Sequence, residues 1–119
     1  HFTLSEMKKF SIAKRQIKQI SILDISGELD AHTSPQQENI LKELIAAQNI
    51  KIIVNCNHLE YIASAGLGVF MAYIEDVRGL GGDIKLSNMN QRVYNVFDLL
   101  GFPTLYDILD KESEAIEAF

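Results

Sequence analysis

The feature that most constrains the fold of this chain is a short run rich in β-branched residues, Ile50–Val54, set between two segments with helical periodicity. An apolar run of this length is typical of a strand buried on both faces, as in a parallel sheet covered by helices. The segment before it, 35–48, and the segment that begins at Ser64 both place apolar residues at helical spacing. Because parallel strands need crossover connections, the pattern predicts an α/β layer structure.

Further strands and helices extend this alternation along the chain. Two apolar-rich segments precede the first helix, and the polar pair Arg15-Gln16 between them suits a hairpin turn, with Gly27 ending the second strand. We predict an α/β fold with a four- to five-stranded, mostly parallel mixed sheet, an opening antiparallel hairpin and about four helices. The expected strands are 8–14, 17–26, 50–54, 83–86 and 105–109, and the expected helices are 35–48, 64 to the glycines at 79, 81 and 82, 91–100 and 110–118.

Residues near the expected helix starts predict where the helices begin. Ser34 is a good N-cap, Pro35 fits the first helical position, and Gln37 stands where a capping box requires it. A polar connection, 55–63, leads to the second helix. There Ser64 is the expected N-cap, since its hydroxyl can accept a hydrogen bond from a free helical N–H.

Composition restricts the functions that are possible. A length of 119 residues corresponds to one domain, and the net charge of −5 argues against a nucleic-acid binder that relies on phosphate contacts. The single cysteine, Cys56, rules out an internal disulfide framework and fits a reducing, cytoplasmic compartment. No run of about 18 apolar residues predicts a membrane span. We assign 7–119 to one monomeric domain and set 1–6 aside as a tag remnant or disordered extension.

A serine hydrolase is the first chemistry to consider, with Ser64 as nucleophile. Its triad would take His58 or His32 as the base and Asp30 as the orienting acid. A nucleophile elbow, however, needs glycine two residues before the serine, and Ile62 stands there. The pattern therefore does not favour an enzyme.

Cofactor and metal sites receive still less support. Gly66 and Gly68 match two glycines of a dinucleotide-binding motif, but Met71 occupies the third position. No pair of histidine, cysteine and acidic residues has zinc-site spacing. Cys56 is expected to be a buried small residue at a strand end. We therefore expect neither a cofactor nor a metal.

The remaining chemistry of Ser64 is that of a modification site. A helix N-terminus favours an anion, and a phosphate would add about −1.5 to −2 charges at one exposed position. Ala63 and Ala65 are small, and Gly66 lets another backbone approach closely, so the hydroxyl is expected to be accessible to a partner.

Two further groups of residues are expected to contact that partner. Glu28 and Asp30 would lie near Ser64 if the second and third strands are neighbours, and their charge favours a basic partner; the alternative role of Asp30 is a turn or cap residue. The helix after Ser64 is apolar on two sides, and its second strip contacts either a partner or the neighbouring helix. The core stripe consists of Leu67, Phe70, Met71, Ile74 and Val77, and the second strip of Ala65, Val69, Ala72 and Tyr73.

Four short motifs, in order, resemble those of a known family. The run Tyr61-Ile62-Ala63-Ser64-Ala65-Gly66-Leu67-Gly68 resembles the signature of STAS domains, and among these it looks most like the bacterial anti-sigma factor antagonists. The resemblance covers about 7–117. The other matching motifs are Gly27-Glu28-Leu29-Asp30, Gly81-Gly82, and Val96-Phe97-Asp98 with Leu100-Gly101.

The resemblance implies a partner-switching protein without enzymatic activity. Its partner would be an anti-sigma factor that is also a serine kinase of the GHKL ATPase type. The unphosphorylated domain would bind the kinase and free the sigma factor, phosphorylation of Ser64 would abolish binding, and a PP2C-type phosphatase would restore it. The residues that we expect to contact the partner are Glu28, Asp30, Ala63, Ala65, Gly66, Val69 and Tyr73.

One position departs from the family pattern. Ala63 stands where the family usually has aspartate directly before the phosphorylated serine. If that aspartate helps the kinase to recognise its substrate, Ser64 is a poorer substrate. The chain then either binds its partner constitutively or belongs to a divergent system with a different regulator. The alternative function is a STAS scaffold subunit of another complex, such as a lipid transporter, without phosphorylation.

Overall fold

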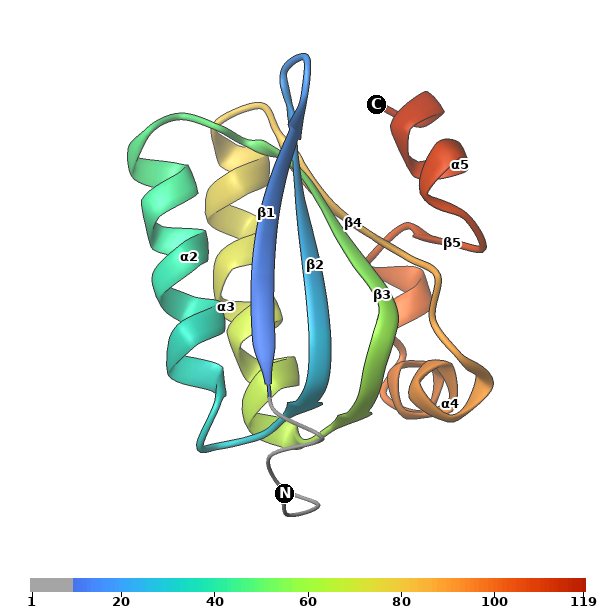
Figure 1. The fold of residues 1–119 in the computed structure, drawn as a ribbon. Coiled ribbons are helices and arrows are strands. Elements are labelled where there is room, and N and C mark those ends of the chain that lie inside the picture. The colour runs from blue at the N-terminus through green and yellow to red at the C-terminus, as the bar shows by residue number, and fades with distance from the viewer. Residues whose placement is uncertain (1–9) are drawn as a thin grey trace, which may run out of the picture.

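The computed structural model describes residues 10–119, so the extension assigned to 1–6 and the start of the first expected strand lie outside the described residues. The chain alternates strands and helices as the sequence pattern predicts (Figure 1). The strands are β1 (Ser11–Ile17), β2 (Ile20–Leu29), β3 (Lys51–Ile62), β4 (Asp83–Ser87) and β5 (Ile108–Leu109), and the helices are α2 (Ser34–Ala46), α3 (Ser64–Gly79), α4 (Gln91–Leu99), a 3-10 turn (Phe102–Thr104) and α5 (Glu112–Glu117).

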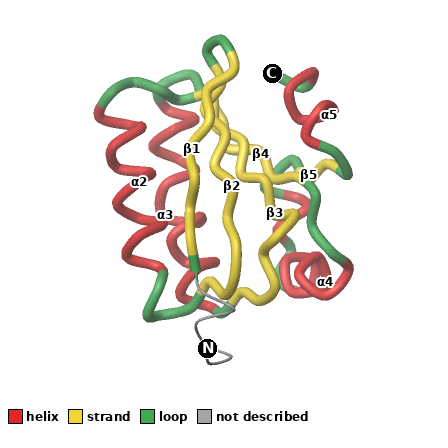
Figure 2. The backbone as a smooth tube through the Cα atoms, in the orientation of Figure 1, coloured by secondary structure: helices red, strands yellow, loops and turns green. Residues whose placement is uncertain are grey.

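The five strands form one mixed sheet with the order β1-β2-β3-β4-β5. β1 pairs with β2 in the antiparallel sense, and every later pair is parallel (Figure 2). Strand order follows chain order because each parallel strand is reached through a helix that packs back on the sheet. The predicted fold class, with its opening hairpin and four α-helices, is confirmed for residues 10–119.

The predicted position of the hairpin turn is wrong by about three residues. Arg15 and Gln16 lie inside β1, and the chain reverses at Lys18 and Gln19, where Ile17 pairs with Ile20. Lys18 adopts a positive φ of 53°. Arg15 remains in the strand because its side chain bridges elements: it donates to Asp24 across the hairpin and to Glu112 on α5.

β2 and β3 both run further than the apolar patterns predict. Gly27 does not end β2 but lies inside it at φ 90°, and the predicted connection 55–63 is mostly strand, since β3 continues to Ile62. The parallel pairing of the two strands continues through two register shifts, after which Leu29 pairs with Ile62. Such irregularities place extra residues on one strand and hide a regular alternation of side chains.

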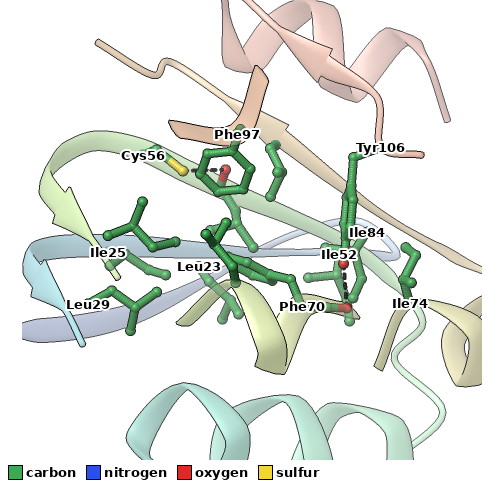
Figure 3. Packing of buried hydrophobic residues seen from close by; sticks show 14 of the residues in the cluster. Leu23, Ile25, Leu29, Ile52, Cys56, Phe70, Ile74, Ile84, Phe97 and Tyr106 are labelled. Carbon is green, nitrogen blue, oxygen red and sulfur yellow. Dashed lines mark hydrogen bonds between the residues drawn. The ribbon is translucent and has the colours of Figure 1, made fainter. Parts of the chain in front are cut away.

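The sheet separates two layers of unequal size. α2 and α3 lie side by side against one face, and α5 lies on the opposite face (Figure 1). The larger core includes the aromatic side chains of Phe70 on α3 and Phe97 on α4, with the buried Tyr106 donating a hydrogen bond to the Phe70 carbonyl at 2.6 Å (Figure 3). No helix within residues 10–119 has the length and apolar character needed to cross a membrane.

Polar contacts fasten α5 to the sheet. Glu112 is held by Arg15 and by Asn55, whose amide donates to it at 3.0 Å. The guanidinium of Arg15 and the amide keep the pKa of Glu112 below its usual range. Phe119, which follows α5, packs its ring over Lys85 of β4, and the Lys85 ammonium lies 4.8 Å from the ring centroid. These contacts position a helix of only six residues that buries few apolar side chains.

Candidate functional site

Ser64 is the first residue of α3 and is exposed to solvent. The predicted N-cap role of Ser64 is wrong: Ala63 takes that position in extended backbone, with φ −104° and ψ 172°, and no side chain caps the helix. Ala63 itself is tied to β2, because its N–H donates to the Leu29 carbonyl at 2.8 Å. The Ser64 hydroxyl therefore does not cap the helix and is accessible to solvent. It lies at the N-terminus of α3, where the helix dipole favours an anion.

The first turn of α3 rests on a tightly packed support. A Cβ added to Gly66 would lie 2.7 Å from the Leu29 Cγ, so glycine is needed here for close packing and not for contact with a partner. Gly66 is buried, and the group that approaches it closely is the side chain of Leu29 and not a partner. Gln37 of α2 is also buried and donates its amide to the Gly66 carbonyl at 3.1 Å.

Asp30 orders the loop between β2 and α2. Its Oδ1 accepts hydrogen bonds from the N–H groups of His32 and Thr33, which is an Asx turn. The Thr33 contact is the main reason why the pKa of Asp30 is lowered, so this carboxylate is charged at neutral pH. The alternative of a turn residue is therefore the observed role of Asp30.

The predicted cap of α2 is displaced by one residue. The helix begins at Ser34, so Thr33 and not Ser34 occupies the N-cap position. Thr33 donates its hydroxyl to the Glu28 carbonyl at 2.8 Å and thereby closes the loop. Gln37, expected to complete a capping box, points instead into the interface of α2 with α3, where it meets Gly66.

The two acidic residues predicted beside Ser64 are brought to its vicinity. Glu28 pairs with Tyr61 in the sheet, and Asp30 follows Leu29, whose carbonyl binds the N–H of Ala63. Glu28 also lines an open hollow of about 620 Å³ at the carboxyl ends of the strands. The other residues of this hollow come from segments that only the fold brings together, so no local sequence pattern identifies them. They are Glu60, Tyr61, Asn90 and Arg92.

The outward face of α3 differs from the predicted partner strip. Val69 and Tyr73 are only partly exposed, and the Tyr73 hydroxyl donates to Glu38 of α2 at 3.1 Å. Contact with the neighbouring helix is therefore the observed role of Tyr73. Met71, expected in the core stripe, is 49% exposed. The exposed side chains that share the face of Ser64 at helical spacing include Met71, Ala72 and the charged Glu75, and Gly68 lies one turn after Ser64 on the same face.

In the part of the chain that the structure describes, no hydrogen bond joins Ser64 to His58, His32 or Asp30, the residues of the predicted triad. His58 lies on β3 four residues before Ile62, which places it roughly 13 Å down the strand at the usual rise per residue. Within residues 10–119, no group of three potential ligands is suited to hold a metal ion. Cys56 is buried inside β3, not at its end, and burial raises the pKa of its thiol to about 12. A thiol of this kind is a core residue.

Comparison with known proteins places this arrangement in a family. The STAS domain model matches residues 11–115, which is most of the chain. This chain belongs to the STAS domain family. It is 30% identical over 95 residues to the anti-sigma-B factor antagonist of Bacillus subtilis, covering 80% of this chain and 86% of the relative. It is 29% identical over 98 residues to the anti-sigma F factor antagonist of Paenibacillus polymyxa, covering 82% and 84%.

Solved structures share the STAS fold of this chain. An anti-sigma factor antagonist from Mycobacterium paratuberculosis superposes with a TM-score of 0.85 at 18% identity, covering 93% of this chain and 94% of the other. The anti-sigma factor antagonist SpoIIAA in its unphosphorylated form gives 0.71 at 23% identity, covering 92% and 96%. SpoIIAA of Bacillus in its phosphorylated form gives 0.70 at 22% identity, covering 92% and 98%. The resemblance seen in the sequence is thereby confirmed: the chain is a STAS domain of the anti-sigma factor antagonist family.

Proposed function

We propose that this STAS domain is a partner-switching antagonist that binds an anti-sigma factor and is released when Ser64 is phosphorylated. The partner acts both as anti-sigma factor and as serine kinase of the GHKL type, and a PP2C-type phosphatase reverses the modification. The domain itself acts as a cytoplasmic monomer, performs no catalysis and needs no cofactor. The similarity to named anti-sigma factor antagonists supports the class of partner.

The observation that carries the proposal is the exposed Ser64 hydroxyl at the start of α3, free of any capping duty. A kinase can reach such a hydroxyl without unfolding the helix. The helix N-terminus then stabilises the phosphate, because its free N–H groups carry a partial positive charge. Modification therefore changes the surface and leaves the fold intact.

The residues around Ser64 explain how a phosphate would act as a switch. Asp30 is ionised at neutral pH and follows Leu29, whose carbonyl binds the N–H of Ala63, and Glu28 lies near the end of β2. A dianion beside these carboxylates makes the surface strongly negative. In a close-packed interface such a charge loses its water, and the cost of an unpaired buried charge is several kcal/mol. The same carboxylates favour basic groups on the unmodified domain's partner.

Ala63 stands where the family usually has aspartate. This difference affects how a kinase would recognise Ser64, and it does not affect how a phosphate on Ser64 would weaken partner binding. Ala63 is the N-cap of α3, and its methyl side chain offers a kinase neither a charge nor a hydrogen bond. We infer that Asp30, on the adjacent strand end, supplies the nearest negative charge to the reaction site. Phosphorylation of Ser64 is accordingly expected to proceed with this chain as substrate.

Incubation with the cognate anti-sigma factor kinase and ATP tests the proposal. We expect a gain of about 80 Da, one phosphate, in the intact protein and its absence in Ser64→Ala. Exposed Ser113 on α5 provides the matched control, since Ser113→Ala is expected to be modified like the wild type. Modification that persists in Ser64→Ala would place the phosphate on another residue and contradict the proposed switch.

The outward face of α3 is expected to form the apolar part of the partner interface. Met71→Glu should weaken binding to the anti-sigma factor at least about tenfold, because a charge placed in an apolar contact must be desolvated. Met71 is half exposed, so thermal stability should not change. Leu80→Glu, at the far end of the helix, is the matched control and should bind normally. Normal binding by Met71→Glu would remove this face from the interface.

The alternative of a scaffold subunit in a transporter complex is not favoured. The curated relatives reported above are anti-sigma factor antagonists, and they match over most of their own length. No specific feature of Ser64 or its surroundings favours a constitutive scaffold. A constitutive scaffold is expected to keep its affinity for its partner after Ser64→Glu, whereas a phosphorylation-controlled antagonist is expected to lose it. Measuring the affinity of this variant therefore separates the two functions.

A further inference from the structure

A second potential binding site lies at the end of the sheet opposite Ser64. β2 and β3 run parallel and begin side by side, with Ile20 paired to Lys51. Their amino ends, the hairpin turn and two residues at the end of the described chain line an open hollow of about 300 Å³, a size within the range of small-molecule sites. Ser64 follows the carboxyl end of β3, so the hollow is separated from it by the length of the strand. The residues that line the hollow are Lys18, Gln19, Ile20, Lys51, Ile116 and Phe119.

The lining of this hollow is divided between apolar and basic groups. Ile20, Ile116 and Phe119 provide the apolar part, and all three belong to or pack against the small core beneath α5. Lys18 and Lys51 provide two ammonium groups, and among the described residues no Asp or Glu side chain lines the hollow. Among residues 10–119, neither lysine forms an ion pair. Two ammonium groups therefore lie beside apolar side chains without a nearby Asp or Glu partner in this part of the chain.

The wall formed by Phe119 is held in place before any ligand arrives. Its ring lies over the ammonium of Lys85, which is almost fully buried and paired with Asp83 at 3.0 Å and Asp107 at 2.7 Å. The opposite wall is the hydrogen-bonded start of β2 and β3. A hollow with fixed walls binds a ligand at a lower entropic cost than one that must be ordered.

A second hollow adjoins the first at the two lysines. It measures about 410 Å³, and it shares Lys18, Gln19 and Lys51 with the apolar hollow. Its remaining lining is mostly amide side chains from the hairpin and from the segment before β3. An anionic head group at the lysines would therefore have polar surroundings on one side and an apolar channel for its tail on the other. The residues found only in the second hollow are Gln16, Gln48, Asn49 and Ile50.

We propose that this end of the domain binds an aliphatic carboxylate, with its head group between Lys18 and Lys51 and its chain against Ile20, Ile116 and Phe119. Carboxylates form charge-assisted hydrogen bonds with ammonium groups, and the alkyl chain gains from leaving water. The ligand joins α5 to the amino ends of β2 and β3. It therefore stabilises the attachment of α5, at a site independent of the proposed switch at Ser64.

Titration of the ¹⁵N-labelled protein with sodium octanoate tests this proposal. We expect saturable shifts of the amide signals of Ile20, Lys51, Ile116 and Phe119, with the Ser64 signal unchanged, and a rise in melting temperature. Octylamine, which has the same chain and the opposite charge, should bind at least about tenfold more weakly. Equal binding of octylamine, or shifts that spread over the surface without saturation, would overturn the proposal.

Substitution of the two lysines distinguishes the head-group contact from simple apolar adsorption. The double variant Lys18→Gln, Lys51→Gln should lose affinity for octanoate at least about tenfold, because each lysine contributes a charge-assisted hydrogen bond. Lys42→Gln, an exposed lysine on α2, is the matched control and should bind octanoate like the wild type. A double variant that folds normally and retains its affinity would show that the lysines do not bind the head group.

Discussion

Replacing Ser64 by glutamate is expected to weaken binding to the anti-sigma factor by about a hundredfold or more while the domain stays folded. The side chain at this position is exposed and caps nothing, so the fold has no need of the hydroxyl. A new carboxylate at the start of α3 is tolerated by the helix, whose N-terminus favours negative charge. In the complex the same carboxylate is desolvated beside Asp30, which is already ionised.

Isothermal titration calorimetry against the purified partner measures this loss, and circular dichroism checks the fold. Ser64→Ala should bind like the unmodified protein, because it removes the modification and adds no charge. Ser113→Glu adds the same charge on α5 at the other face of the sheet and should leave the affinity unchanged. If Ser64→Glu binds with wild-type affinity, a charge at this position does not control the complex and the proposed switch is wrong.

Gly82→Ala is expected to destabilise the domain by about 3 kcal/mol or more, which corresponds to a fall in melting temperature of about 10 °C or more. A Cβ on Gly82 would lie 2.1 Å from the carbonyl oxygen of Ile50, at the start of β3. That oxygen accepts a hydrogen bond from the N–H of Asp83 at 2.9 Å, the first contact between β3 and β4. The clash can be relieved only by moving the backbone of Ile50 or Gly82, because the nearest atom is a backbone oxygen and not the end of a flexible side chain. That movement weakens the pairing of β3 with β4.

Thermal denaturation followed by circular dichroism gives the comparison, with Gly68→Ala as the control. Gly68 lies in α3 with nothing within 4 Å of the position of its missing Cβ. Alanine there is expected to stabilise the helix by about 0.5–1 kcal/mol, because glycine loses more backbone entropy on folding. Equal melting temperatures for Gly82→Ala and Gly68→Ala would contradict the close approach of the two strands.

The fold class can be predicted from the local periodicity of apolar residues. The boundaries of the individual strands and helices cannot. The run Ile50–Val54 and the two flanking helical patterns were enough to predict a parallel sheet with crossover helices. The second half of β3 was missed because its register shifts against β2 break the alternation that identifies a strand. The hairpin turn was misplaced because Arg15, a residue typical of loops, is held in β1 by carboxylates from β2 and α5.

Part of the candidate site could also be predicted from local sequence patterns. The exposure of Ser64 and its place at the start of a helix could be predicted from small neighbouring residues and helical spacing, and both agree with the structure. The orientation of α3 about its own axis could not be predicted from the sequence. The spacing of its apolar residues identifies two candidate faces, but only the packing of α2 shows that Tyr73 faces the neighbouring helix and Met71 faces solvent.

The sequence by itself determined the order of the elements, the mixed sheet and the serine that opens α3, because these depend on patterns within about twenty residues. Only the tertiary structure decided how far β2 and β3 extend, why Gly66 and Gly82 must be glycine, and which side chains meet in the two end hollows. Those features depend on contacts between residues far apart in the chain. Such contacts form only when burial of the whole core brings the segments together.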